Sequence, residues 1–135
     1  MVYVERRITI VHLKKPIEHS LNEELQWLGS SLGLFNLRDK NSSCFRIFIE
    51  LLKSAKTGKP LSSDELALHL ELTRGTVVHH INRLMESGMV VHEGNKYYLR
   101  VHRLQSLIEE LRKDTERTLD DLEDAAKQID DMIGL

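Results

Sequence analysis

Residues 74–83 carry polar and cationic side chains that, at their spacing along a helix, could bind an anionic polymer. In and after this segment Val77, Ile81 and Leu84 recur at helical spacing, which predicts the buried face of a helix. The residues left on the outer and lateral faces are Arg74, Thr76, His79, His80 and Arg83. No acid occurs among them before Glu86. A helix of this diameter fits the major groove of DNA, where arginine can pair with guanine through two hydrogen bonds and a threonine methyl can contact thymine.

A short hairpin after this helix adds further candidate contacts. Strands are predicted at 89–93 and 96–100, joined by the two-residue turn Gly94-Asn95. Lys96, beside the turn, could reach the DNA backbone or the minor groove. The full set of candidate DNA contacts is Arg74, Gly75, Thr76, His79, His80, Arg83, Asn95 and Lys96.

These residues are expected to play different parts. Recognition helices enter the groove N-terminus first, so Arg74 and Thr76 are placed to read base edges. His79 lies further along the same face and could donate or accept a hydrogen bond. Arg83 lies two turns into the helix, where a phosphate contact is the expectation. His80 has a second interpretation, as a structural residue bonded inside the domain.

The seven histidines raise the question of metal binding or catalysis. His79 and His80 are adjacent and point about 100° apart on a helix, so they do not readily hold one ion. The sequence contains no HExxH, CxxC, glycine-rich phosphate loop or nucleophile elbow. Its single cysteine, Cys44, excludes an intrachain disulfide. We expect no enzyme activity, no cofactor and no metal; the alternative is a metal site or enzyme built from histidines of two chains.

The segments around the candidate helix predict a mainly α fold with a small β-wing. Helices are expected over 21–33, over 41–55, after Ser62, and over 74–87. Capping boxes at Ser20/Glu23 and Ser62/Glu65 mark two of the starts, and Thr73 caps the last. A helix pair joined by about three residues and followed by a hairpin is the order of a winged helix-turn-helix.

The residues 71–99, ELTRGTVVHHINRLMESGMVVHEGNKYYL, resemble the winged-helix heads of prokaryotic ArsR-like and TrmB-like transcription regulators, including archaeal ones. The matching positions are Thr76, Val77, His80, Ile81, Leu84, Ser87, Gly88, Tyr97 and Tyr98. The resemblance covers roughly residues 40–103 and implies DNA binding. Metal-sensing members carry a cysteine pair in the helix before the turn, whereas SSDELALHL here has none. The family usually has Ser where Val78 stands.

The two ends of the chain are expected to serve packing and assembly. Residues 2–13 are rich in β-branched residues and predict one β-strand, followed by the helix 21–33. The tail predicts a helix of about 30 residues, roughly 45 Å long, which a head of this size cannot cover. Along this helix a seam of residues recurs at alternating steps of three and four, and we expect this seam to pair with another chain. The seam consists of Leu104, Ile108, Leu111, Thr115, Thr118, Leu122, Ala125, Ile129 and Met132. The alternative is a helix folded back over its own domain.

Charge divides the chain in the same way. We assign residues 1–37 to packing or assembly, 38–103 to a winged-helix DNA-binding domain and 104–135 to a coiled-coil dimerisation helix. The middle segment carries eleven basic and seven acidic residues, a net +4, and the tail four against ten, a net −6. The middle could therefore meet nucleic acid, which the tail should avoid.

The expected function is sequence-specific binding of double-stranded DNA in transcription regulation, by a cytoplasmic homodimer or tetramer. No stretch approaches the roughly 18 apolar residues of a membrane span, and the N-terminus lacks the pattern of a signal peptide. The alternative function is a protein-interaction module, or a recruiter of a basal transcription factor, because winged helices also serve as protein-binding parts of the transcription machinery.

Overall fold

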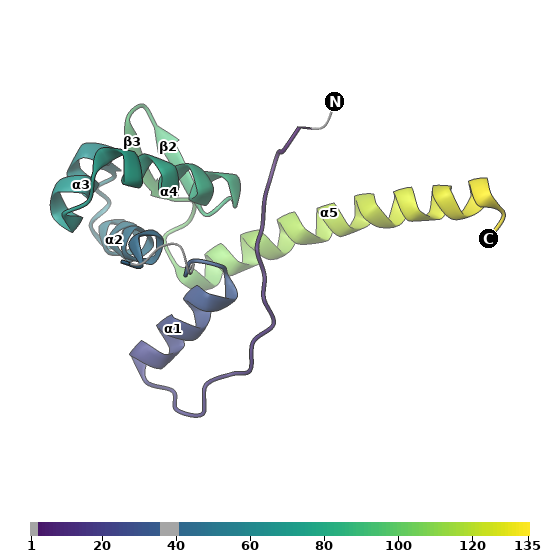
Figure 1. Ribbon diagram of the computed structural model, residues 1–135, viewed down its shortest axis with the longest axis horizontal. Coiled ribbons are helices and arrows are strands. Elements are labelled where there is room, and N and C mark those ends of the chain that lie inside the picture. Colours follow the sequence, from purple (N-terminus) through teal and green to yellow (C-terminus); the bar gives the residue numbers. More distant parts are fainter. Residues whose placement is uncertain (1–2, 36–40) are drawn as a thin grey trace.

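The protein has a mainly helical head from which one long helix extends. The computed structural model describes residues 3–35 and 41–135. Its elements are α1 (Leu21–Ser31), α2 (Ser43–Thr57), β1 (Leu61–Ser62), α3 (Ser63–Leu70), α4 (Arg74–Glu86), β2 (Val90–Glu93), β3 (Lys96–Leu99) and α5 (Leu104–Ile133). Figure 1 shows α2, α3, α4 and the wing, which is the β2–β3 hairpin, packed together as the head, with α5 leading away from them. The predicted fold class, mainly α with a small β-wing and a long C-terminal helix, is confirmed.

Capping side chains fix the residues at which α3 and α4 begin. The Ser62 hydroxyl accepts a hydrogen bond from the Glu65 N–H at 3.1 Å, and the Glu65 carboxylate accepts one from the Ser62 N–H at 3.3 Å. At the start of α4 the Thr73 hydroxyl accepts from the Thr76 N–H at 3.1 Å. Each such cap stabilises a helix start by about 1 kcal/mol. The two helices therefore begin where the sequence predicted.

The strands form one antiparallel sheet in the order β1-β3-β2. Val90 pairs with Leu99 and Glu93 with Lys96, which is the predicted hairpin. The third strand, β1, was not predicted; Leu61 lies opposite Tyr97 and joins the start of α3 to the wing. Two residues are too few to show the alternation by which a strand is identified in a sequence.

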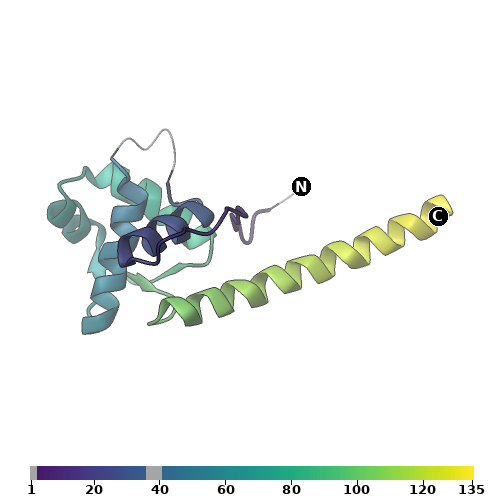
Figure 2. The same ribbon diagram turned by 90° about the horizontal axis from the view of Figure 1, so that it is seen from below.

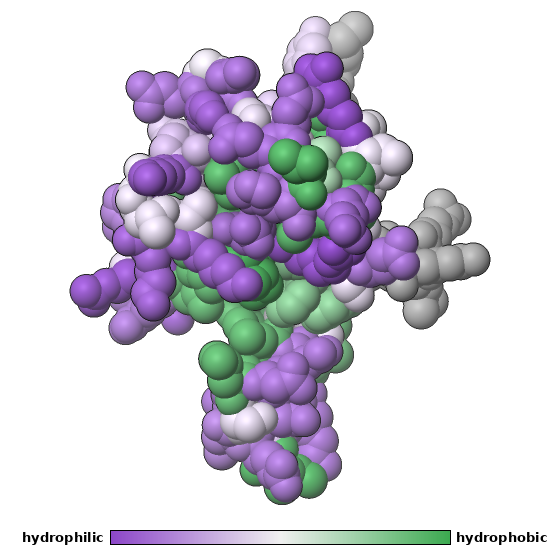
Figure 3. Space-filling model, turned by 90° about the vertical axis from the view of Figure 1, so that its left-hand side faces the viewer, coloured by the Kyte–Doolittle hydropathy of each residue, from purple (hydrophilic) through white to green (hydrophobic). Residues whose placement is uncertain are grey.

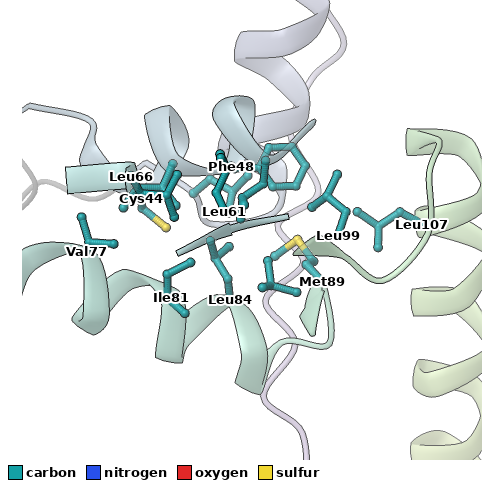
Figure 4. Packing of buried hydrophobic residues seen from close by; sticks show 14 of the residues in the cluster. Cys44, Phe48, Leu61, Leu66, Val77, Ile81, Leu84, Met89, Leu99 and Leu107 are labelled. Atoms are coloured by element: carbon teal, nitrogen blue, oxygen red, sulfur yellow. The ribbon is translucent and has the colours of Figure 1, made fainter. Parts of the chain in front are cut away.

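The core lies around α2, on which Ile47, Phe48 and Leu51 are at most 1% exposed. In Figure 4 the α4 side chains Val77, Ile81 and Leu84 lie on one side of this cluster, and Met89, just before β2, and Leu99 of β3 lie at its end. Leu107 from the first turns of α5 is also fully buried. Burying one such side chain contributes about 1.5–3 kcal/mol, so the root of α5 is a fixed part of the head.

The N-terminal segment is not a β-strand, and that prediction is wrong. Residues 3–13 belong to no helix and to no sheet, and Val2 lies outside the described residues. The Arg7 N–H donates to the Glu86 carbonyl at 2.9 Å, and the Val11 N–H to the Ser31 carbonyl at 2.8 Å. These acceptors lie at the ends of two helices, so no strand edge is offered. The segment crosses α5 in Figure 1.

A buried carboxylate on α5 fixes this segment to the head. The side chain of Asp114 is 5% exposed and accepts hydrogen bonds at 2.6 Å from Arg100 and from Arg117. Arg6 Nε of the N-terminal segment lies 3.6 Å from the same carboxylate. The hydrogen bond from Arg100, opposed by burial and aided by the charges of the three arginines, holds the pKa of Asp114 below its ordinary value.

Replacing this carboxylate should therefore change the response of stability to pH. A lowered folded-state pKa contributes stability above the ordinary value near 3.8, and that contribution is lost as pH falls through the lowered pKa. We expect Asp114→Asn to lower the free energy of unfolding by about 2–4 kcal/mol at pH 7, and by progressively less below pH 4. Urea unfolding across pH measures this, with Asp120→Asn on the exposed part of α5 as the control. A deficit that stays constant with pH contradicts it.

Candidate nucleic-acid interface

The exposed face of α4 consists of residues that the core leaves outside. From its N-terminus the exposed residues are Arg74, Gly75, Val78, His79, Asn82 and Glu86. The first turn of α4 contains no acid. The partial positive charge at this helix end is thus not offset by a carboxylate within its own turn, which favours an approaching anion. The end of the head seen in Figure 3 is mostly hydrophilic, with hydrophobic surface gathered toward its lower part.

Arg74 is the most accessible cation of this face. Its side chain is 73% exposed, and Nε lies 3.6 Å from the carboxylate of Asp64, which is 77% exposed. An ion pair this exposed contributes about 0–1 kcal/mol, so a phosphate or a guanine edge can displace it at little cost. A Cβ added at Gly75 would have no atom within 4 Å, so the backbone there is open to a close approach.

Thr76 is held in place by the cap of its own helix. Besides receiving the N–H bond of Thr76, the Thr73 hydroxyl donates to the Thr76 hydroxyl at 2.8 Å. The Thr76 side chain is half-buried. Its hydroxyl is therefore oriented before any ligand arrives, and Thr73, which sequence reasoning treated only as a cap, contributes to that orientation.

The two adjacent histidines are placed differently. His79 is exposed, whereas His80 is 6% exposed, and their rings meet edge to face with centroids 5.1 Å apart. A side chain inside the head does not reach a DNA groove. We therefore correct the assignment of His80 to the contact set: the structural role, which was the second interpretation, accounts for its position. Adjacent side chains on a helix point about 100° apart, which explains why His79 is exposed and His80 is buried.

Arg83 and the wing lie away from the leading end of α4. Arg83 is half-buried and lines a small hollow with Arg7, Cys44 and Glu86, beside the N-terminal segment. Asn95 is exposed in the wing turn, which Gly94 makes possible with a φ of +60°. The candidate interface thus has its leading end at Arg74, with Arg83 on one flank and the wing turn at Asn95 on the other.

Lys96 is engaged with the helix-turn-helix. Its ammonium group contacts the Glu65 carboxylate, and its side chain is 42% exposed. That contact is the main reason why the pKa of Glu65 is lowered, followed by the hydrogen bonds from Ser62. If Lys96 contacts a DNA phosphate, its ammonium group would therefore have to contact both that phosphate and Glu65.

Sequence reasoning missed two exposed residues of α4. Val78 was noted only as a departure from the usual Ser, and it is 36% exposed. Asn82 lies one turn beyond Val78 and is exposed. An asparagine can pair with adenine through two hydrogen bonds, so Asn82 belongs with the candidate contacts. The spacing of Gly75, His79 and Asn82 by four and three residues was the signal for it.

The seam predicted on α5 divides into two parts. Leu111 is 4% exposed inside the head, and Leu104 and Ile108 pack against the same core. These three residues serve the head of their own chain and are withdrawn from the dimerisation set. Farther out, the helix is exposed from residue 116 onward. Thr118, Leu122, Ala125, Ile129 and Met132 remain from the prediction, Thr115 is half-buried at the boundary, and the exposed Leu119 and Ile133 join them.

Among residues 3–35 and 41–135, no three His, Cys, Asp or Glu side chains gather in a way that could hold a metal ion. None of the helices described there combines the length and the apolar character needed to cross a bilayer.

Comparison with known proteins identifies the domain that carries this face. Residues 49–91 match the family model described as "Bacterial regulatory protein, arsR family". A search of the curated proteins and of the solved structures finds no match to the chain. The family consists of regulators rather than enzymes, and its helix-turn-helix indicates a DNA-binding transcription regulator. The match runs from within α2 to within β2 and contains all of α3 and α4, so residues 49–91 form an arsR-family winged helix-turn-helix domain.

Proposed function

We propose that this protein is a sequence-specific, double-stranded-DNA-binding transcription regulator that acts as a dimer in the cytoplasm. The observation that carries the proposal is the exposed face of α4, whose first three turns present Arg74, His79 and Asn82 without an acid. The arsR-family match over residues 49–91 contains α4, which supports the proposal because the second helix of a helix-turn-helix is the one that enters the major groove.

Within this face, base reading is assigned to the leading end. Arg74 and Thr76 are the base-reading pair, with His79 and Asn82 following along the exposed side. Gly75 allows the backbone to approach the duplex. Arg83, Asn95 and Lys96 are assigned to phosphates, which position the protein without reading sequence.

The dimer is assigned to the outer part of α5. Leu119, Leu122 and Ile129 are each more than half exposed along a helix that has left the head. Figure 2 shows this part of α5 standing clear of the rest of the molecule. A contiguous apolar stripe of this kind marks an interaction site, and a heptad-like spacing suits a second helix.

Selection of bound sites from random duplex DNA tests the proposal. We expect one enriched motif with two related halves, and an affinity that falls steeply as salt rises. Failure to bind any duplex, or binding that is insensitive to salt, would instead support a protein-interaction module that recruits a basal transcription factor. The mass of the free protein in solution, measured in parallel, tests the dimer.

Lys96 offers a test of the flanking contacts. We expect Lys96→Ala to weaken binding to preferred and random duplexes by the same factor and to reduce the slope of log affinity against log salt by about one. Lys96→Arg, which keeps the charge, is the control. A variant that changes the preferred motif would contradict the assignment of Lys96 to phosphate.

A further inference from the structure

A groove runs between the N-terminal segment and α5. It lies beside the exposed apolar stripe of α5, which consists of Leu119, Leu122, Ala126, Ile129 and Ile133. The part nearer the head is lined by Arg6, Arg7, Ile8, Ile10, Thr115, Thr118 and Leu119 and has a volume of about 440 Å³. Its continuation outward is lined by Tyr3, Val4, Glu5, Arg6, Arg7, Thr118 and Asp121. Two segments far apart in sequence therefore build one surface at the root of the free part of α5.

This surface contains exposed apolar side chains that nothing covers in the described chain. Tyr3 is 78% exposed, Val4 56% and Ile10 62%. On the facing helix Leu119 begins the exposed stripe that continues to Ile133. The groove and the stripe are thus continuous, so a helix laid along the stripe would enter the groove.

The stripe and the groove differ in charge. Between residues 119 and 133 the helix carries six acids and one base, Lys127. The groove nearer the head is lined by Arg6 and Arg7 and by no acid, and Arg117, whose side chain is 70% exposed, directly precedes Thr118 of its lining. Arg6 and Arg117 share the carboxylate of Asp114, and Arg7 pairs with Glu86 at 3.3 Å, so these arginines outnumber the carboxylates that they contact. Glu5 and Asp121 occur only in the outward continuation.

Resting on the dimer of the proposed function, we infer that two copies pair with their α5 helices antiparallel, so that the outer half of each α5 lies in the groove of the other copy. This arrangement sets the acidic outer halves against Arg6, Arg7 and Arg117 of the partner copy. A parallel pair would place acidic half against acidic half and groove arginines against groove arginines. Like charges brought together in this way are unfavourable.

The spacing of the apolar residues fits the antiparallel pair. Positions 115, 119, 122, 126, 129 and 133 have the same intervals when counted from either end. Reversing one helix sets Leu119 against Ile129 and Leu122 against Ala126, so a large residue meets a small one at the centre. In the parallel pair Ala126 would meet Ala126 and leave a gap.

The N-terminal segment is needed because the helix pair alone is short. From residue 115 to residue 133 the overlap is about 28 Å, under three heptads, which is marginal for an isolated pair of helices. Ile8 and Ile10 add apolar area at both ends of the overlap. The ion pair of Arg6 with Asp114 holds this segment where the partner helix arrives.

Cross-linking of full-length chains tests the arrangement. In a Cys44→Ala background, one chain carries Val4→Cys and another Met132→Cys, and a short bifunctional maleimide is added to each alone and to their mixture. We expect a covalent dimer in the mixture and none with Met132→Cys alone, because antiparallel pairing separates the two copies of residue 132 by more than about 20 Å. Chains in which Ser63→Cys replaces Val4→Cys control for random collision.

The possible failures point to different conclusions. Efficient cross-linking of Met132→Cys to itself would show a parallel dimer and overturn the inference while leaving the proposed function intact. A monomeric mass, with no cross-link in any mixture, would overturn the dimer and the inference together. Salt gives a label-free check: attraction between unlike charges predicts a dimer that weakens as salt rises, whereas a parallel pair would tighten.

Discussion

The double variant Leu122→Asp with Ile129→Asp should be a folded monomer that has lost tight binding to DNA. Both side chains are more than half exposed in the single chain, so the head loses no packing. In a dimer, however, the change would bury four carboxylates without partners, at several kcal/mol each. We expect the dissociation constant of the dimer to rise at least 1,000-fold, which corresponds to about 4 kcal/mol.

Loss of the dimer should carry over to DNA. In a dimer, binding of the first head to one half-site holds the second head at a high effective concentration near the other half-site. A monomer has no such second head. We expect affinity for a two-half motif to fall to that for a single half-site. Analytical ultracentrifugation and binding to one- and two-half duplexes measure the two effects. The matched control is Lys127→Gln with Gln128→Asp, which makes the chain more negative by the same two charges off the stripe. A Leu122→Asp, Ile129→Asp variant that remains dimeric at micromolar concentration contradicts the assignment.

The choice of these two positions depends on what the structure adds to the sequence. The periodic seam ran from Leu104 to Met132 without a break, and periodicity alone does not say whether a stripe faces its own head or a partner. Leu111 is 4% exposed within the head, so Leu111→Asp would unfold the protein rather than separate a dimer. Only the three-dimensional position of α5 distinguishes the two uses of one pattern.

Local signals predicted the part of the fold that positions the site. Ser62, Glu65 and Thr73 act within four residues of their own positions, so capping fixed the starts of α3 and α4 in the sequence itself. The burial of Val77 and Ile81 followed from helical spacing in the same way. The exposure of Asn82 follows from the same spacing.

Signals that depend on distant partners were less informative. The β-branched residues of segment 3–13 predicted a strand, but a strand also needs a free edge, and the acceptors present are the carbonyls of Glu86 and Ser31. The contact between Lys96 and Glu65 joins residues 31 apart, and the cluster at Asp114 joins three segments. No spacing in the sequence predicts such contacts.

Arg74→Ala should separate specificity from affinity. Arg74 stands at the leading end of α4, and its only ion pair in the described chain is a 3.6 Å contact between exposed groups. A guanidinium that pairs with guanine through two hydrogen bonds gives about 1–3 kcal/mol of discrimination. We therefore expect the variant to lose roughly 5- to 150-fold in affinity for the selected motif, and only a small factor on random duplex.

Two further variants sharpen this result, because a base contact and a phosphate contact depend differently on shape and charge. Arg74→Lys keeps the charge but not the planar fork, so it should preserve random binding and lose most of the discrimination. Asp64→Ala removes the nearby carboxylate and should strengthen binding to all duplexes without changing the preferred motif, since a rim charge acts through its field rather than through a base edge. Competition binding against the selected motif and against random duplex measures each factor at fixed salt. If Arg74→Ala instead weakens all duplexes equally and Arg74→Lys restores them, Arg74 binds phosphate, and the reading of base edges must then lie with Thr76, His79 and Asn82.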